Sequence, residues 1–218
     1  MGKRKKLTER TLENALKAKS FRVAVFGSAR IKKNDEIYKN VFDLAKKIGE
    51  KKFHLVTGGG PGLMEAANAG HSAGDPKDEA DNIGLLIKLP WEPGGNVHLE
   101  IQKEFDKFSG RLDKFIALSN VMVVVPGGVG TLLELSYAWQ LVQVKHIQPV
   151  QIILIGEMWE EFVKWIEKYP LKKGLICEKD MDCIHVVKNN EEAMKLIEVA
   201  HEGFKQGKNV NEPYLLGK

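Results

Sequence analysis

Short apolar runs alternate with longer amphipathic stretches along the chain, and most of the runs end at glycine or proline. The runs predict strands at 21–26, 53–57, 83–89, 121–125, 151–155 and 183–187. Between them, apolar residues recur at helical spacing in stretches at 35–49, 62–72, 99–118, 131–144, 158–168 and 190–204. The alternation predicts one α/β domain, Rossmann-like, with a doubly wound and mostly parallel sheet.

The two ends of the chain differ from this middle part. Residues 1–20 combine a basic arm, Lys3 to Lys6, with a short predicted helix that carries Leu12 and Leu16. Residues 21–204 hold the predicted domain, and 205–218 form a polar tail. An acidic loop is predicted at 75–82.

Composition narrows the class of protein. The 218 residues are 43% hydrophobic and 28% charged, as in an ordinary globular protein rather than a disordered one. The net charge of +4 is concentrated in the terminal arm, which we interpret as a solvated terminus, so we expect no nucleic-acid partner. Two cysteines are too few for a disulfide framework, and no apolar run approaches the roughly 18 residues of a membrane span. We therefore expect a soluble cytoplasmic protein with no membrane partner.

Two glycine-rich loops carry the first candidate chemistry. Residues 57–62 (TGGGPG) and 126–131 (PGGVGT) each follow a predicted strand and open a helix. Ligands of doubly wound sheets bind beyond the carboxyl ends of the strands, and glycine with a helix N-terminus favours a phosphate there. Neither loop is followed by the Gly-Lys-Ser/Thr of a P-loop. Leu133 stands where a dinucleotide fingerprint needs its third glycine, which disfavours NAD.

Charged residues near the second loop admit two interpretations each. Thr131 and Glu134 have the spacing of a helix capping box, but Glu134 is also placed to reach the sugar of a nucleotide. Arg111 shares a predicted helix face with Lys107 and Lys114. This face is either a solvated basic surface or the source of a guanidinium for phosphate or sugar oxygens.

The segments 26–28 (FGS), 58–68 (GGGPGLMEAAN) and 126–134 (PGGVGTLLE) resemble the LOG (LONELY GUY) family. These enzymes are nucleoside 5′-monophosphate phosphoribohydrolases, long labelled lysine decarboxylase-like. The resemblance implies a Rossmann fold, a homodimer or larger assembly, and no metal or organic cofactor. It also implies hydrolysis of a nucleotide such as AMP, or a cytokinin riboside monophosphate, to the free base and ribose 5-phosphate.

The resemblance also assigns site residues. It implies Arg111 and Glu134 as the catalytic pair. The residues it implies for phosphate and substrate binding are Gly127, Gly128, Val129, Gly130 and Thr131, with Gly27, Ser28, Gly60, Met64 and Glu92 lining the site. The chain departs from the family pattern at Leu112, where a lysine is usual, at Glu65, where short members often have glycine, and in its longer loop at 75–82. These departures bear on substrate preference.

Other functions remain open at this stage. A non-catalytic carrier of a nucleotide or of the molybdenum cofactor is the main alternative, because such carriers resemble the same family. Literal decarboxylation would need pyridoxal phosphate on a lysine. Residues 70–74 (GHSAG) match a nucleophile motif, but they end a predicted helix, so a catalytic Ser72 is not expected. The six histidines lack metal-site spacing, and the apolar stripe around Trp139 belongs either to the core or to a dimer interface.

Overall fold

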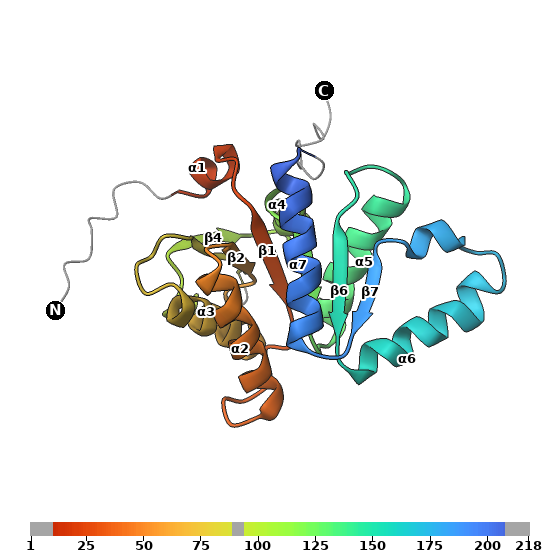
Figure 1. Ribbon diagram of the computed structural model, residues 1–218, viewed down its shortest axis with the longest axis horizontal. Helices are drawn as coiled ribbons and strands as arrows, with labels where there is room; N and C mark the ends of the chain where they lie inside the picture. The colour runs from red at the N-terminus through yellow and green to blue at the C-terminus, as the bar shows by residue number, and fades with distance from the viewer. Residues whose placement is uncertain (1–10, 89–93, 208–218) are drawn as a thin grey trace.

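The computed structural model describes residues 11–88 and 94–207, which form a parallel sheet covered by helices on both faces (Figure 1). The seven strands lie in the order β4-β3-β2-β1-β5-β6-β7, and every adjacent pair is parallel. Their bounds are β1 Arg22–Phe26, β2 His54–Thr57, β3 Asn82–Ile87, β4 Ile101–Phe105, β5 Val121–Val124, β6 Gln151–Ile155 and β7 Ile184–Val187. The α/β class and the Rossmann-like doubly wound sheet are confirmed.

The helices follow the strands in alternation. They are α1 Leu12–Lys17, α2 Glu36–Glu50, α3 Leu63–Gly74, α4 Phe108–Leu118, α5 Val129–Gln143, α6 Glu157–Ile166 and α7 Asn190–Lys205. A π-helical turn, Glu167–Leu171, and a 3₁₀ turn, Glu178–Met181, lie between α6 and β7. No helix within residues 11–88 and 94–207 is long and apolar enough to cross a membrane.

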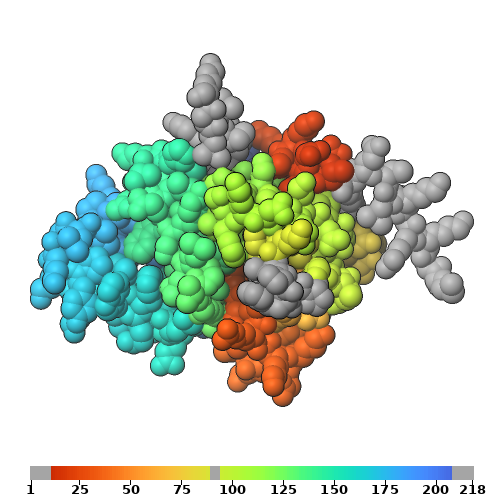
Figure 2. Space-filling model, turned by 180° about the vertical axis from the view of Figure 1, so that it is seen from behind, coloured from red at the N-terminus to blue at the C-terminus, as the bar shows by residue number. Residues whose placement is uncertain are grey.

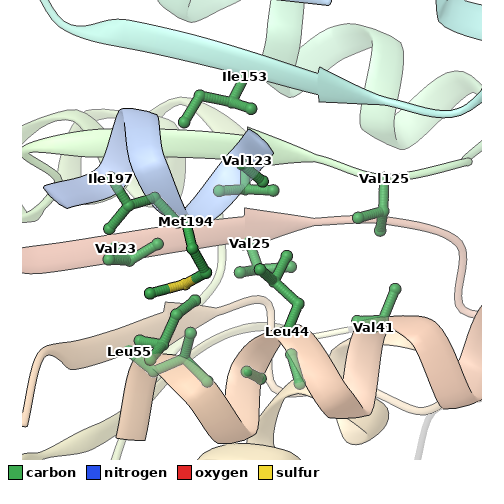
Figure 3. Packing of buried hydrophobic residues seen from close by; sticks show 14 of the residues in the cluster. Val23, Val25, Val41, Leu44, Leu55, Val123, Val125, Ile153, Met194 and Ile197 are labelled. Carbon is green, nitrogen blue, oxygen red and sulfur yellow. The ribbon is translucent and has the colours of Figure 1, made fainter. Parts of the chain in front are cut away.

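Alternation of side chains along the central strands builds two cores. Val23 and Val25 of β1 point to the face covered by α2, α3 and α7, where they pack with Leu44 and Ile197 (Figure 3). Ala24 and Phe26 point to the other face, covered by α1, α4, α5 and α6. Figure 2 looks onto this second face, with α6 and the turns after it at one edge. A strand buried on both faces explains why 121–125 is apolar throughout.

One predicted helix is wrong. The stretch 99–118 divides into strand β4 and helix α4. Ile101, Phe105, Phe108 and Leu112 are spaced by four, three and four residues, which reads as a single helix stripe. The first two belong to the edge strand, where Ile101 is buried while the next three residues are exposed. Because three consecutive residues of this edge strand are exposed, apolar and polar residues do not alternate along it, and the sequence shows no strand pattern.

The short first helix is fixed to the sheet by a buried arginine. The Arg22 guanidinium donates to the carbonyl oxygens of Ala15, Ala18 (3.0 Å) and Ser20 (3.2 Å), around the end of α1. The backbone N–H of Arg22 donates to Asn120 Oδ1 at 2.8 Å. A cation at a helix C-terminus satisfies the last carbonyls of that helix, so Arg22 serves the fold at the edge opposite the glycine loops.

Candidate functional site

Three turns meet at the carboxyl ends of the central strands β2, β1 and β5. Ser28, after β1, donates its N–H to the carbonyl of Pro126 after β5 at 3.0 Å. The carbonyl of Ser28 accepts from the N–H of Leu63, the first residue of α3, at 2.8 Å. Strands β1 and β5 are neighbours, but helix α2, which follows β1, and helix α5, which follows β5, cover opposite faces of the sheet, and such a switch point opens a crevice for ligands.

The second glycine loop opens this crevice at the start of α5. Gly128 is the N-cap of α5 and makes no side-chain cap hydrogen bond. A Cβ at Gly128 or at Gly130 would meet no heavy atom within 4 Å, and Val129 is 83% exposed. The first N–H groups of this helix therefore have open space in front of them. That arrangement suits an anion, because these groups have no partner within the helix.

The capping-box interpretation of Thr131 and Glu134 is wrong. Helix α5 begins at Val129, so Thr131 lies inside its first turn and is buried. Its side chain packs against Gly127, where an added Cβ would collide with Thr131 Oγ1. Glu134 consequently lies a full turn inside α5, too far along to cap it, and its carboxylate points to a different partner.

That partner is Arg111. Arg111 Nη1 lies 3.4 Å from Glu134 Oε1, and the two side chains are only 10% and 12% exposed. The Arg111 Nε donates to the carbonyl of Leu85 in β3 at 2.6 Å, and the guanidinium lies 5.2 Å from the centre of the Phe115 ring. The interpretation of Arg111 as part of a solvated basic face is therefore wrong, whereas Lys107 on that face is exposed.

Burial sets the acid–base character of Glu134. Removal of the carboxylate from water raises its pKa to about 7, and the positive charge of Arg111 opposes part of that rise. At neutral pH this carboxyl group is divided between its ionised and protonated forms. A group with such a pKa exchanges protons readily near pH 7, as general acid–base chemistry requires.

The backbone of the first glycine loop lies directly against the Arg111 guanidinium. A Cβ on Gly58 would collide with Arg111 Nη2 and would lie 2.6 Å from Met64 Sδ. Only a residue without a side chain leaves the guanidinium where it is. Gly60 is buried in the same turn, and Gly27 lies against Val125 and Leu63. Met64 therefore lies beside Gly58 and Arg111, whereas Gly27, Ser28 and Gly60 belong to the turns after β1 and β2 at the same end of the sheet.

Sequence reasoning missed a ladder of buried amide side chains beneath this loop. Asn68 Oδ1 accepts from Thr57 Oγ1 at 2.8 Å and from Asn96 Nδ2 at 2.9 Å. Asn68 Nδ2 donates to Asn82 Oδ1 at 2.6 Å. Asn96 also donates to the carbonyls of Gly59 and Gly60. The available signal was Asn68 itself, a polar residue on the apolar face of α3.

The remaining candidate residues have separate positions and partners. Glu92 lies outside the described residues. Glu65 forms an ion pair with Lys33 at 2.8 Å, and Leu112 is buried. Ser72 lies near the end of α3, where its Oγ accepts from Asn82 at 3.1 Å. Trp139 donates from Nε1 to the carbonyl of Asp180 at 2.6 Å, which favours a core role over an interface.

Metal-ligating side chains do not gather into a binding site in the part of the chain that the structure describes. Residues 11–88 and 94–207 contain no group of three or more His, Cys, Asp or Glu side chains placed to hold a metal ion. The polar groups of the site are therefore the Arg111 guanidinium, the Glu134 carboxylate, the open backbone N–H groups at the start of α5 and the edges of the glycine turns.

The family model described as "possible lysine decarboxylase" matches residues 64–197, which include both Arg111 and Glu134. The chain belongs to this family. The resemblance to LOG proteins is thereby confirmed at the level of the family. A curated relative in Escherichia coli K12, a pyrimidine/purine nucleotide 5′-monophosphate nucleosidase, is 30% identical over 123 residues. That match covers 53% of this chain and 26% of the relative, so the chain spans about a quarter of the relative's length.

Solved structures share the fold of this family member. The molybdenum cofactor binding protein of Rippkaea orientalis has a TM-score of 0.62 at 20% identity, covering 83% of this chain and 96% of that one. The molybdenum cofactor carrier protein of Chlamydomonas reinhardtii also scores 0.62 at 20% identity, covering 84% and 99%. DNA processing protein A of Helicobacter pylori scores 0.53 at 16% identity, covering 87% and 83%. At such identities the likeness concerns the fold alone.

Proposed function

We propose that this protein hydrolyses the N-glycosidic bond of a nucleoside 5′-monophosphate, with AMP or an N6-modified AMP as the expected substrate. The observation that carries the proposal is the buried Arg111–Glu134 pair beside the open N-terminus of α5. The E. coli relative, which is named as a nucleosidase of such monophosphates, supports the same substrate class. Membership of the family together with this arrangement of site residues supports a function more strongly than likeness of fold does.

The phosphate is bound first in this proposal. The N–H groups at the start of α5, from Gly128 to Thr131, receive the 5′-phosphate, and the helix dipole favours its negative charge. Gly27, Ser28, Gly60 and Met64 line the crevice for the sugar and base. Binding energy from this remote phosphate then holds the sugar in its reactive position, so that it lowers the barrier rather than only tightening binding.

Bond cleavage follows at the anomeric carbon of the ribose. The C1′–N bond breaks, its electron pair goes to the base, and C1′ acquires oxocarbenium character, as in other glycoside hydrolyses. The Glu134 carboxylate stabilises that positive charge and takes a proton from the attacking water, whose oxygen bonds to C1′. Glu134 then gives up the proton it took from water, and the departing base nitrogen gains one, so the carboxylate is restored. The products are the free base and ribose 5-phosphate, and no metal or organic cofactor enters the scheme.

Arg111 has a separate part in this scheme. Its Nε is held by the Leu85 carbonyl and its Nη1 faces Glu134, so the guanidinium has a fixed orientation. From there it binds ribose or phosphate oxygens with a planar set of donors. Its charge also keeps the Glu134 pKa lower than burial alone would set it. Glu92 is a candidate second carboxylate, to be assessed by substitution.

The test compares nucleotides with their dephosphorylated forms. Purified protein is incubated with AMP, GMP, IMP, CMP, UMP and an N6-modified AMP, and in parallel with the corresponding nucleosides. We expect base release from the monophosphates and far less from the nucleosides, because the α5 N-terminus binds the phosphate. Equal release from nucleosides would contradict the phosphate-binding role of residues 127–131.

A molybdenum-cofactor or nucleotide carrier on the same fold is the second candidate, supported by the two carrier structures described above. A carrier binds its ligand and releases it unchanged. Tight binding of a monophosphate without any base release would favour this candidate. Leu112, which stands where a lysine is usual, would then be the residue that distinguishes this chain from the hydrolases of the family.

A further inference from the structure

A second polar contact joins helices α4 and α5 close to the Arg111–Glu134 pair. The Tyr137 hydroxyl, on α5, donates to Asp113 Oδ1, on α4, at 2.5 Å. This length is that of an O–H···O⁻ hydrogen bond, one of the strong classes of hydrogen bond in proteins. Both side chains are half-buried, so water competes for this bond less than it does at the open surface. Neither side chain takes part in the proposed hydrolysis.

The Tyr137 hydroxyl keeps its proton over the whole range in which Glu134 titrates. Burial of the phenol, its hydrogen bond to Asp113 and the charge of that carboxylate raise the pKa of Tyr137 to about 12. Glu134, by contrast, has a pKa of about 7. The Tyr137 donor is therefore constant while Glu134 gains or loses its proton, so the two effects can be measured separately.

The two contacts reach one face of α5 from different sides of α4. Both helices pack in the same core and run in the same direction, because α4 leads into β5 and α5 leads out of it. Glu134 and Tyr137 are three residues apart and share a face of α5, whereas Arg111 and Asp113 are two residues apart and leave α4 on different sides. Two such contacts restrain both the distance between the helices and the rotation of α4 about its axis.

Different parts of the fold hold the two members of the Arg111–Glu134 pair. Arg111 is tied to the sheet through the Leu85 carbonyl, whereas the position of Glu134 follows that of α5. The 3.4 Å between Nη1 and Oε1 exceeds the length of a tight ion pair, so mutual attraction does not set this separation. A bond that fixes α5 relative to α4 is placed to set it.

We propose that Tyr137 is a positioning residue, whose hydrogen bond to Asp113 sets the separation of Arg111 from Glu134. The expected effect on rate rests on the proposed hydrolase function, whereas the effect on the pair itself does not. Loss of the hydroxyl lets α5 shift relative to α4. The open N–H groups at the start of α5 shift together with Glu134, so phosphate binding is largely kept. The alignment with Arg111, on which the chemical step depends, is lost.

Kinetics of two variants that break the same bond test the effect on rate. Tyr137→Phe removes the hydroxyl and keeps the ring, and we expect kcat to fall about ten-fold with KM within about two-fold of the wild type. Asp113→Ala should act alike, and the double variant should lose no more than the larger single loss, because one bond carries both effects. An unchanged kcat in Tyr137→Phe, or additive losses in the double variant, would overturn the proposal.

Two further variants separate positioning from simple loss of a polar group. Asp113→Asn retains an acceptor for the Tyr137 hydroxyl and should keep most of the rate that Asp113→Ala loses. Tyr38→Phe is the matched control, because it removes the hydroxyl of a buried tyrosine from the core on the other face of the sheet. A loss of kcat in Tyr38→Phe equal to that in Tyr137→Phe would also overturn the positioning role.

A measurement without substrate distinguishes failure of this inference from failure of the proposed function. The free energy of unfolding is followed against pH with and without Glu134→Gln, in the wild type and in Tyr137→Phe, and the difference reports the titration of Glu134. We expect Tyr137→Phe to move the midpoint by about half a pH unit or more, because the charge of Arg111 and the exclusion of water both act on Glu134 at its present position. Tyr38→Phe should leave the midpoint in place.

Each result of that titration decides one of the two claims. An unmoved midpoint in Tyr137→Phe overturns the positioning role, whatever the protein's enzymatic activity. A moved midpoint in a protein that releases no base from any monophosphate supports the positioning role and contradicts the hydrolase function instead.

Discussion

Arg111 and Glu134 come from different helices and meet in a crevice that neither helix could build alone. Their closest atoms, Nη1 and Oε1, are 3.4 Å apart, and both side chains are almost withdrawn from water. The separation is longer than that of a tight charge-assisted hydrogen bond, which is usually 2.7–2.9 Å. The pair is therefore held by its surroundings, the Leu85 carbonyl, the Phe115 ring and the Gly58 backbone, rather than by its own attraction.

Substitution of Arg111 tests its contribution to the reaction. We expect Arg111→Ala to lower kcat/KM by about 10²–10³, because a fixed donor near the developing charge is lost. The pKa of Glu134 should rise further, since Arg111 is the cation that lowers it. The pH profile of kcat/KM would then shift toward alkaline pH in the residual activity. Lys103→Ala on the exposed side of β4 is the control and should change neither quantity.

A methyl group at Gly58 offers a way to displace Arg111 while the arginine itself stays in the sequence. We expect Gly58→Ala to lower kcat/KM strongly, because the new Cβ collides with Arg111 Nη2 and crowds Met64 Sδ. Gly110→Ala is the matched control, since its Cβ would lie 3.8 Å from Phe105 in ordinary contact within α4. The control should gain about 0.5–1 kcal/mol of stability from helix propensity and keep its activity. Full activity in Gly58→Ala would show that the position of Arg111 is not critical.

The amide ladder beneath the first glycine loop should matter chiefly for stability. Asn68→Ala removes the partner that Thr57, Asn82 and the half-buried Asn96 share, at a position that is itself fully buried. We expect a loss of about 1–3 kcal/mol in the free energy of unfolding, measured by chemical denaturation. Asn190→Ala removes an exposed hydrogen bond to the Asn40 carbonyl and should cost about 0.5 kcal/mol or less. Equal losses in the two variants would contradict the role of burial.

The raised pKa of Glu134 has a consequence for stability that can be measured without substrate. The native state binds this proton more tightly than the unfolded chain does, because the pKa of Glu134 is about 7 when folded and has the ordinary glutamate value of 4.5 when unfolded. The stabilising contribution is therefore fully present below about pH 4.5 and is lost as the pH rises through about 7. Over that window the wild type should lose roughly 3 kcal/mol that Glu134→Gln does not lose. Parallel pH–stability curves for the two proteins would contradict the assignment.

Ionisation of Glu134 should also control activity, but activity should rise with pH where stability falls. Because the proposed mechanism uses the ionised carboxylate, kcat/KM of the wild type should rise as the pH passes through about 7. A rate that falls over this range would indicate that the protonated carboxyl group is the active form. Glu134→Asp, which retains an ionisable group on a shorter stem, is expected to retain a pH dependence at a lower rate.

The sequence predicted the sheet well because strands buried on both faces leave long apolar runs such as 121–125. It failed at β4, where Ile101 and Phe105 continue the spacing of the following helix and the outer strand face is polar. The apolar spacing therefore predicted a single helix over a segment that contains a strand and a helix. The other edge strand, β7, was predicted because its residues Ile184–Val187 are mostly apolar, so the polar outer face of β4 is what hid that strand.

The site was only partly readable from the sequence. The glycine loops indicated where the strands end. The motif at 126–134 identified Glu134 as a candidate site residue. The burial of Arg111 did not follow, because it depends on Leu85 in β3 and on Gly58 in the turn after β2. The ladder that links Asn68, Asn82 and Asn96 was equally hidden, since its members lie in separate elements and meet only when the sheet has formed.

The central claim is that Arg111 and Glu134 cleave the bond between base and ribose phosphate. The most direct measurement quantifies free base and ribose 5-phosphate together, from AMP and from N6-modified AMP, for the wild type, Glu134→Gln and Arg111→Ala. We expect equimolar products from the wild type and little or no release from either variant, with all three proteins folded. Undiminished release by Glu134→Gln, or no release by folded wild type from any monophosphate, would contradict it.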